Sequence, residues 1–133
     1  MPMSYSIDKQ RHLVLTRCWG VLSDADLLAH KAQLASDPDF HASMGQLSDV
    51  RAIERLAVTT EGVKLMVAHD TANADRVGGH RMALVVASDE VFGMARMYGQ
   101  RSEAGAQGVG VFRSITDAKV WLAAGRSRAS DSS

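Results

Sequence analysis

The sequence predicts a single α/β domain in which about four helices pack on a mixed five-stranded sheet. Segments with strand-like alternation and segments with helical spacing follow one another along most of the chain. The first two strand-like segments have no helix between them, and neither a repeat nor a linker divides the chain. The expected order is therefore β-β-α-β-α-β-α-β-α, with an opening hairpin followed by parallel strands joined by right-handed crossovers.

Composition supports one domain and argues against several classes of partner. The 133 residues are 46% hydrophobic, which is enough for one core. Fifteen basic and fifteen acidic side chains cancel, so we expect neither nucleic acid nor an anionic membrane as a partner. No run approaches the roughly 20 apolar residues of a transmembrane segment, and the first residues lack a signal-peptide pattern. Cys18, the one cysteine, lies in an apolar run. We therefore expect a cytoplasmic protein in which this side chain is buried.

The opening hairpin and the first helix have clear local signals. Tyr5–Asp8 alternates, a polar turn follows, and Leu13–Leu22 alternates with apolar residues on both faces, which is typical of a central strand. Gly20 indicates a bulge or a close backbone approach. Ser23 then begins a helix, because a hydroxyl can cap the first turn and the acidic residues that follow favour the helix dipole. Asp37-Pro38 ends this helix, since the residue before proline avoids the helical region.

The remaining elements alternate between strand and helix. In chain order they are expected at Gln46–Val50 (strand), Thr60–Ala74 (helix), Arg81–Ala87 (strand), Asp89–Gly99 (helix), Val109–Arg113 (strand) and from Thr116 onwards (helix). Asp49 lies near the end of the third strand, and a connector with a short apolar stretch, Leu56–Val58, leads to the next helix. Residues 4–124 would form the domain, and residues 125–133, which are mostly small and polar, a flexible tail.

No catalytic, cofactor or metal site is predicted. The histidines are scattered, no pair has the i, i+4 spacing of a helical metal site, and one cysteine cannot build a structural zinc site. The sequence contains neither a Gly-x-Ser-x-Gly elbow nor a phosphate-binding loop ending in Gly-Lys-Ser/Thr. The glycines at Gly105, Gly108 and Gly110 follow a helix and precede a strand, the reverse of the dinucleotide-binding order. We therefore expect a protein that is not an enzyme.

The segment between the third strand and the next helix is the main candidate site. It contains Asp49 at the predicted strand end and Thr59, Thr60, Glu61 and Gly62 at the helix start. Ligands of an open α/β sheet bind at the carboxyl ends of its strands, and a helix N-terminus offers unpaired N–H groups to an anion. The alternative is that the threonine pair only caps its own helix, which is the preferred interpretation for Ser88 and Ser114 at two other helix starts.

The predicted helix at Asp89–Gly99 is a second candidate surface. Met94 and Tyr98 belong to an apolar stripe at helical spacing, which is typical of a core face. Phe92 and Met97 fall on either side of this stripe. Aromatic and methionine side chains beside a core stripe often mark a protein-partner or homodimer surface, so that interpretation stands beside a broad core face.

With these segments placed on the predicted order, the chain resembles the STAS-type domains of anti-sigma-factor antagonists, and more closely the SpoIIAA-like (STAS-like) bacterial proteins. The resemblance covers roughly residues 4–124 and includes Gly78-Gly79 before a strand and Val111-Phe112-Arg113 before the last helix. It implies a SpoIIAA/STAS-like α/β fold. In the signalling members an apolar strand leads to Asp-Ser-Ser-Gly at a helix start, where a partner kinase, also the anti-sigma factor, phosphorylates a serine.

The resemblance also shows where this chain departs from the signalling members. With Gly62 aligned to the family glycine, Thr60 and Glu61 occupy the serine pair and Thr59 replaces the aspartate. Glu61 then stands at the phosphoserine position, which implies a module that binds an anti-sigma-factor-like or kinase-like protein without the standard switch. The alternative is that Thr60, or Thr59 in a shifted register, is the phosphate acceptor. The architecture is shared with CRAL-TRIO-type lipid carriers. The alternative is therefore a domain that binds an apolar small molecule or lipid, with Phe92, Met94, Met97 and Tyr98 lining the opening.

Overall fold

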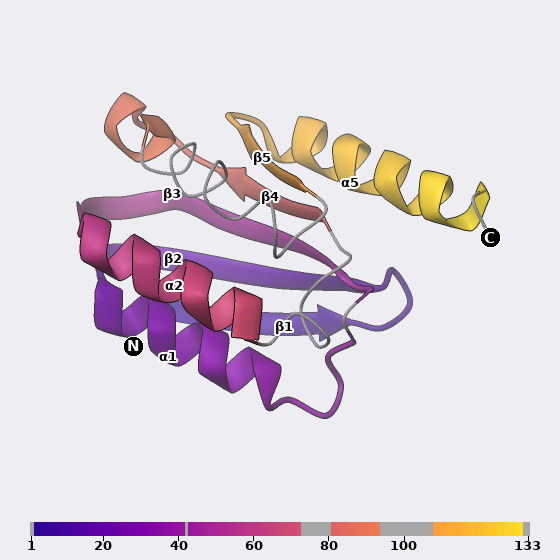
Figure 1. Ribbon diagram of the computed structural model, residues 1–133. Helices are drawn as coiled ribbons and strands as arrows, with labels where there is room; N and C mark the ends of the chain where they lie inside the picture. Colours follow the sequence, from indigo (N-terminus) through magenta and orange to yellow (C-terminus); the bar gives the residue numbers. More distant parts are fainter. Residues whose placement is uncertain (1, 42, 73–80, 94–107, 132–133) are drawn as a thin grey trace.

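The computed structural model describes residues 2–41, 43–72, 81–93 and 108–131 (Figure 1). Its elements are β1 (Met3–Asp8), β2 (Leu13–Ser23), α1 (Asp24–Ala35), β3 (Gly45–Ala57), α2 (Thr60–Ala72), β4 (Arg81–Val85), β5 (Gly108–Phe112) and α5 (Ile115–Asp131). Residues 89–93 are also helical, at the start of the predicted third helix, and the rest of that helix lies outside the described residues. The predicted α/β class and the order of its elements are confirmed.

The five strands form one sheet in the order β1-β2-β3-β4-β5. β1 pairs with β2 in antiparallel fashion, as expected for the opening hairpin. All the other neighbours are parallel, as expected for strands that alternate with helices. β2 therefore lies inside the sheet, between β1 and β3, while β1 and β5 are its two edges.

Helices cover both faces of the sheet, with α1 and α2 on one face and α5 on the other (Figure 1). Successive side chains of a strand point to opposite faces, and neighbouring residues of β2 accordingly join different core clusters. Val14 packs with Leu34 of α1, whereas Leu13 and Leu15 belong to a cluster that contains Leu122 of α5. A third cluster, built around Val63, Met66 and Met82, fixes α2 on the sheet.

Two local features of β2 agree with the predictions from the sequence. The side chain of Cys18 is 1% exposed, as predicted. Gly20 has φ +65° and lies at a register shift between β2 and β3, which confirms the predicted irregularity. Trp19 and Val21, on either side of Gly20, remain 40% and 49% exposed. The apolar surface of this central strand is thus only partly covered.

Two element ends differ from the prediction. β3 runs from Gly45 to Ala57, well beyond the predicted Gln46–Val50, so the expected connector is itself strand. Its second half pairs with the long second half of β2, from Trp19↔Ala52 to Ser23↔Ala57. α5 is helical through Asp131, so most of the backbone of the predicted tail, residues 125–133, continues the helix.

Candidate functional site

Thr59 caps the start of α2 with its side chain. Its Oγ1 accepts a hydrogen bond from the backbone N–H of Gly62 at 2.9 Å, and its carbonyl accepts the N–H of Val63 at 3.0 Å. A hydroxyl at this position satisfies one of the N–H groups that a helix start leaves without an intrahelical acceptor. Of the two predicted interpretations, this geometry favours the helix cap.

Asp24, the first residue of α1, completes the site. Its Oδ1 accepts the backbone N–H of Thr59 at 2.9 Å, and its Oδ2 accepts the Thr59 hydroxyl at 2.7 Å. The carboxylate therefore lies at the N-terminus of α2, where negative charge is stabilised. An external anion at this helix start would meet a carboxylate that already satisfies the Thr59 donors. The Asp24 carboxylate thus takes the position that an external anion would occupy.

Sequence reasoning missed Asp24 as a member of this site. In the sequence it is one of two acidic residues in the first turn of α1, where Asp26 completes a capping box with Ser23. Its contact with Thr59, 35 residues away, depends on α1 and α2 packing side by side (Figure 1). No local pattern signals that contact.

Gly62 has a specific steric reason to be glycine. A Cβ built on this residue would overlap the carboxyl group of Asp24. Gly62 is buried, and its N–H is the donor that the Thr59 hydroxyl accepts. Asp24, Thr59 and Gly62 therefore form one interlocked unit, which we call the α2 cap.

Two of the remaining predicted site residues are exposed beside the α2 cap. Thr60 is the first residue of α2 and Glu61 the second, and both are exposed. Glu61 places a negative charge in the first helical turn, where the helix dipole favours it. The start of α2 is therefore acidic on its outer side as well.

Asp49 has a different environment. It lies within β3 and not at its end, and its carboxylate forms two side-chain hydrogen bonds of 2.9 Å with Arg51. The bonds from Arg51, with a further contribution from Arg17, hold the pKa of Asp49 below its usual range. It lines a shallow hollow of about 350 Å³ together with residues of β1 and α5, including Ser4 and Lys119. Asp49 therefore belongs to the lining of this hollow and is not part of the α2 cap.

The second predicted surface is described only at its beginning. Phe92 is half-buried, and the guanidinium carbon of Arg113 lies 5.1 Å from the centroid of its ring. Arg113 also donates to the carboxylate of Asp89 and to the carbonyl of Ala87. The other residues of the predicted opening, Met94, Met97 and Tyr98, lie outside the described residues.

Ser88 and Ser114 follow the capping pattern expected for them. The Oγ of Ser88 accepts the N–H of Val91 at 3.2 Å. The Oγ of Ser114 accepts the N–H of Asp117 at 3.4 Å. Each hydroxyl therefore serves the helix that it precedes, as in the preferred interpretation.

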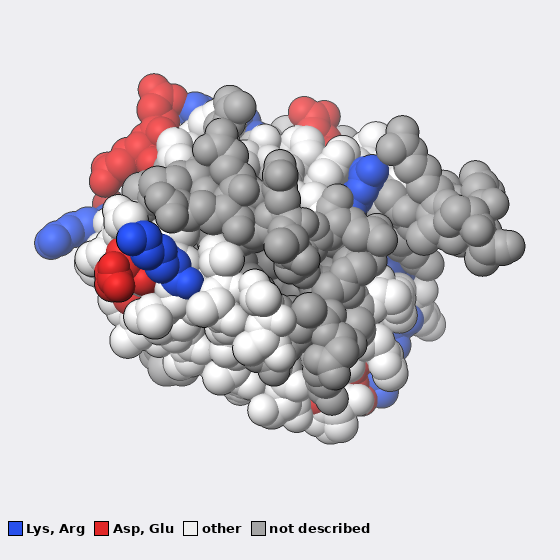
Figure 2. Space-filling model, in the orientation of Figure 1, with Lys and Arg blue, Asp and Glu red and all other residues white. Residues whose placement is uncertain are grey.

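The outer face of α2 continues from the α2 cap as a mostly uncharged surface. Leu65 is 52% exposed, and Ala68 and Ala72 are exposed on the following turns. Lys64, next to Leu65, is exposed as well. Figure 2 shows acidic and basic side chains gathered at the end of the molecule where β3 ends and α2 begins, with a basic side chain over the first part of α2, whereas the described surface over the rest of α2 is largely uncharged. An apolar strip beside a charged rim is a common composition for a protein-binding surface.

The described part of the chain offers no group of three or more His, Cys, Asp or Glu side chains that could hold a metal ion. Within the same residues, no helix is both long and apolar enough to cross a membrane.

The architecture defines a class: the protein is a mixed α/β domain with a SpoIIAA-like fold. It is similar to the crystal structure of an uncharacterized protein of the DUF3478 family with a SpoIIAA-like fold from Shewanella loihica PV-4. The TM-score is 0.60 at 16% sequence identity, and the match covers 90% of this chain and 93% of the other. The likeness at this identity concerns the fold. The sequence matches no protein-family model and no curated protein.

Proposed function

We propose that this chain is a non-enzymatic protein-interaction module that works in the manner of an anti-sigma-factor antagonist, without a phosphoserine switch. Its recognition surface begins at Glu61 and continues along α2 over Leu65. The observation that carries the proposal is the α2 cap, because it supplies a fixed negative charge at the helix start where the related switches add a phosphate.

Electrostatics at the helix start support the absence of a switch. A phosphate on Thr59 would remove the hydroxyl that donates to Asp24 at 2.7 Å and place two anionic groups in contact. A phosphate on Thr60 would adjoin Glu61. Like charges at this spacing repel, so phosphorylation would destabilise the local structure that it would have to control.

The first experiment tests the switch. We expect protein purified from its host to have the intact mass of the unphosphorylated chain, and we expect Thr60→Glu to retain its partner in affinity capture. Stoichiometric phosphate on Thr59 or Thr60, together with loss of the partner in Thr60→Glu, would contradict the proposal.

The second experiment tests the surface. Leu65→Asp adds a charge to the exposed strip of α2, so we expect capture of the partner from host extract to fall by about tenfold or more, as at interface residues that matter. Val120→Asp is the matched control, because Val120 is also exposed, at 65%, but lies on α5. Equal capture by both variants, with unchanged thermal unfolding, would place the partner surface elsewhere.

A further inference from the structure

β1 is a free edge of the sheet. Among the described residues it pairs with β2 and with no other strand. Its six residues, MSYSID, contain no lysine or proline, which are residues that commonly protect edge strands from further pairing. The strand is therefore open to pairing along its outer side.

The register identifies the backbone groups that face outwards. Trp19 donates its N–H to the carbonyl of Pro2 at 2.9 Å, so this pair is a hydrogen-bonded one. Hydrogen-bonded and non-bonded pairs alternate along an antiparallel ladder. The pairs Ser4↔Arg17 and Ser6↔Leu15 are then hydrogen-bonded as well. The N–H and C=O groups of Met3, Tyr5 and Ile7 consequently point away from β2, toward the free edge.

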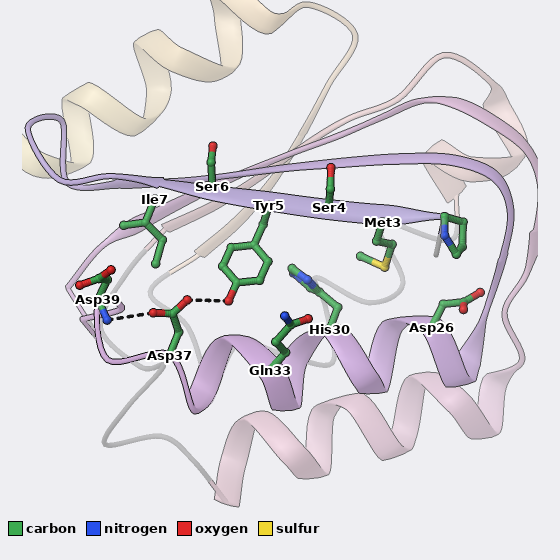
Figure 3. A pocket seen from close by; sticks show the side chains of 11 residues that line it. Met3, Ser4, Tyr5, Ser6, Ile7, Asp26, His30, Gln33, Asp37 and Asp39 are labelled. Atoms are coloured by element: carbon green, nitrogen blue, oxygen red, sulfur yellow. Dashed lines mark hydrogen bonds between the residues drawn. The ribbon is translucent and has the colours of Figure 1, made fainter.

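A groove of about 550 Å³ lies under this edge, between β1 and α1. Met3, Tyr5 and Ile7 extend their side chains toward α1, whereas Ser4 and Ser6 point to the opposite face (Figure 3). The ring of His30, from α1, meets the ring of Tyr5 edge-on with centroids 5.4 Å apart. The residues with outward-facing backbone groups are thus the ones that form the roof of the groove.

The groove is acidic. Among the described residues that line it are three carboxylates, those of Asp26, Asp37 and Asp39, and no lysine or arginine. Asp26 accepts from the N–H and hydroxyl of Ser23, and Asp37 accepts from the hydroxyl of Tyr5 at 2.6 Å. These hydrogen bonds lower the pKa values of Asp26 and Asp37, so both carboxylates are charged at neutral pH. Asp39 forms an ion pair of 3.0 Å with Lys9.

His30 adds no compensating positive charge to the groove at neutral pH. Burial, with a smaller contribution from Lys31, lowers the pKa of His30 to about 4, so the ring is neutral at pH 7. The groove therefore places three carboxylates next to a row of open backbone groups.

We propose that the free edge of β1 is a docking site for an extended peptide that carries lysine or arginine at alternate positions. The peptide adds a strand to the sheet through the outward groups of Met3, Tyr5 and Ile7. Because side chains alternate along a strand, every second residue of the peptide enters the groove between β1 and α1, where a basic group meets the carboxylates. The intervening residues face the hollow that contains Ser4, Ser6 and Asp49.

The test uses the full chain, labelled with ¹⁵N, and a seven-residue peptide of alternating lysine and valine with blocked ends. We expect the peptide to slow hydrogen exchange at the amides of Tyr5 and Ile7, which gain acceptors. The amides of Ser4 and Ser6 already bond to β2 and should change little. A peptide with glutamate in place of lysine should have no effect. If the lysine peptide gives no protection at Tyr5 and Ile7 up to about 1 mM, the proposal is wrong.

Charge-neutralising variants test the groove separately from the edge. Asp37→Asn combined with Asp39→Asn should weaken binding of the lysine peptide by roughly tenfold. Glu54→Gln, which neutralises an exposed carboxylate on β3, should leave it unchanged. Equal weakening by Glu54→Gln, or equal binding of the glutamate peptide, would overturn the charge argument. Protection of Tyr5 and Ile7 without peptide, in a species of twice the monomer mass, would assign the edge to a second copy of this chain instead.

Discussion

Asp24 is the first residue of α1, and its carboxylate accepts two hydrogen bonds from Thr59 at the start of α2. This arrangement couples two helices through one side chain and explains why residue 62 is glycine. A methyl group on Gly62 would displace the Asp24 carboxylate, and the displaced carboxylate could not keep both bonds to Thr59.

Gly62→Ala should therefore destabilise the protein although alanine is the better helix former. The lost hydrogen bonds cost about 1–2 kcal/mol, and the gain in helix propensity recovers at most about 1 kcal/mol. We expect a net loss of up to about 1 kcal/mol in the free energy of unfolding, measured by urea titration.

The same substitution in an Asp24→Ala background is the control. Without the carboxylate there is space for the methyl group, so Gly62→Ala should then stabilise the protein by up to about 1 kcal/mol. A change of the same sign in both backgrounds would show that Asp24 does not determine the residue at position 62.

Cys18 provides a second prediction at the level of a single residue. Burial, with a smaller contribution from the charge of Asp49, raises the pKa of Cys18 to about 12. Since the thiolate is the reactive form, Cys18 should react with a disulfide reagent at pH 8 far more slowly than a free thiol. In denaturant the reaction should be complete within the mixing time. Rapid labelling of the native protein would contradict both the burial and the raised pKa.

At the scale of elements, local patterns were enough to predict all five strands and the helix starts, because hydroxyl caps and apolar alternation are local signals. The length of β3 was not predictable in this way. Arg51, Glu54 and Arg55 are exposed, so its second half lacks a strand-like apolar face. That half is strand because the long second half of β2 pairs with it, which is a tertiary contact. The missed contact between Asp24 and Thr59 has the same origin.

Arg81 shows how one side chain docks a whole helix. It lies at the start of β4, its guanidinium carbon is 4.6 Å from the centroid of the Trp121 ring, and its Nη1 donates to the carbonyl of Trp121 at 2.9 Å. Trp121 in turn packs against Phe112, with ring centroids 5.5 Å apart. The guanidinium thus joins the side chain and the backbone of α5 to the sheet.

Arg81→Met should loosen α5 because it keeps the aliphatic stem but removes the stacked charge and the hydrogen bond. We expect a loss of about 1–2 kcal/mol in the free energy of unfolding and faster amide exchange in α5 than in α1. Val120→Ser, at an exposed position of the same helix, should change neither quantity. Uniform acceleration of exchange in α1 and α5 would mean that Arg81 does not act on α5 in particular.

At the scale of the whole molecule, two features lie at different parts of the sheet. The α2 cap lies where the parallel strands end and their helices begin, while the free edge of β1 and its acidic groove lie along one side (Figures 1 and 3). The position of the α2 cap could be predicted in part from the sequence, since helix starts gather at the carboxyl ends of parallel strands. The groove could not, because Asp26, His30 and Asp37 face the side chains of β1 only when α1 packs beneath this strand.

His30 connects that groove to the stability of the whole domain. Its pKa is lowered from the ordinary value near 6.5 to about 4, chiefly by burial and secondarily by Lys31, in spite of the nearby carboxylates of Asp26 and Asp37. The unfolded chain therefore binds a proton between pH 6.5 and 4 that the folded chain does not. The free energy of unfolding is therefore highest above pH 6.5. It decreases by up to about 3 kcal/mol in total as the pH falls through this window.

The pH range in which His30 affects the free energy of unfolding lies above the range in which the carboxylates do. Asp37 and Asp49 have lowered pKa values, so their contributions are kept at pH 5 and lost only in stronger acid. We expect urea titrations to give a lower free energy of unfolding at pH 5 than at pH 7 and His30→Gln to reduce that difference, because glutamine fills a similar space without titrating. His41→Gln, at an exposed position, should keep the wild-type difference. An unchanged pH dependence in His30→Gln would mean that the ring is not held neutral between β1 and α1.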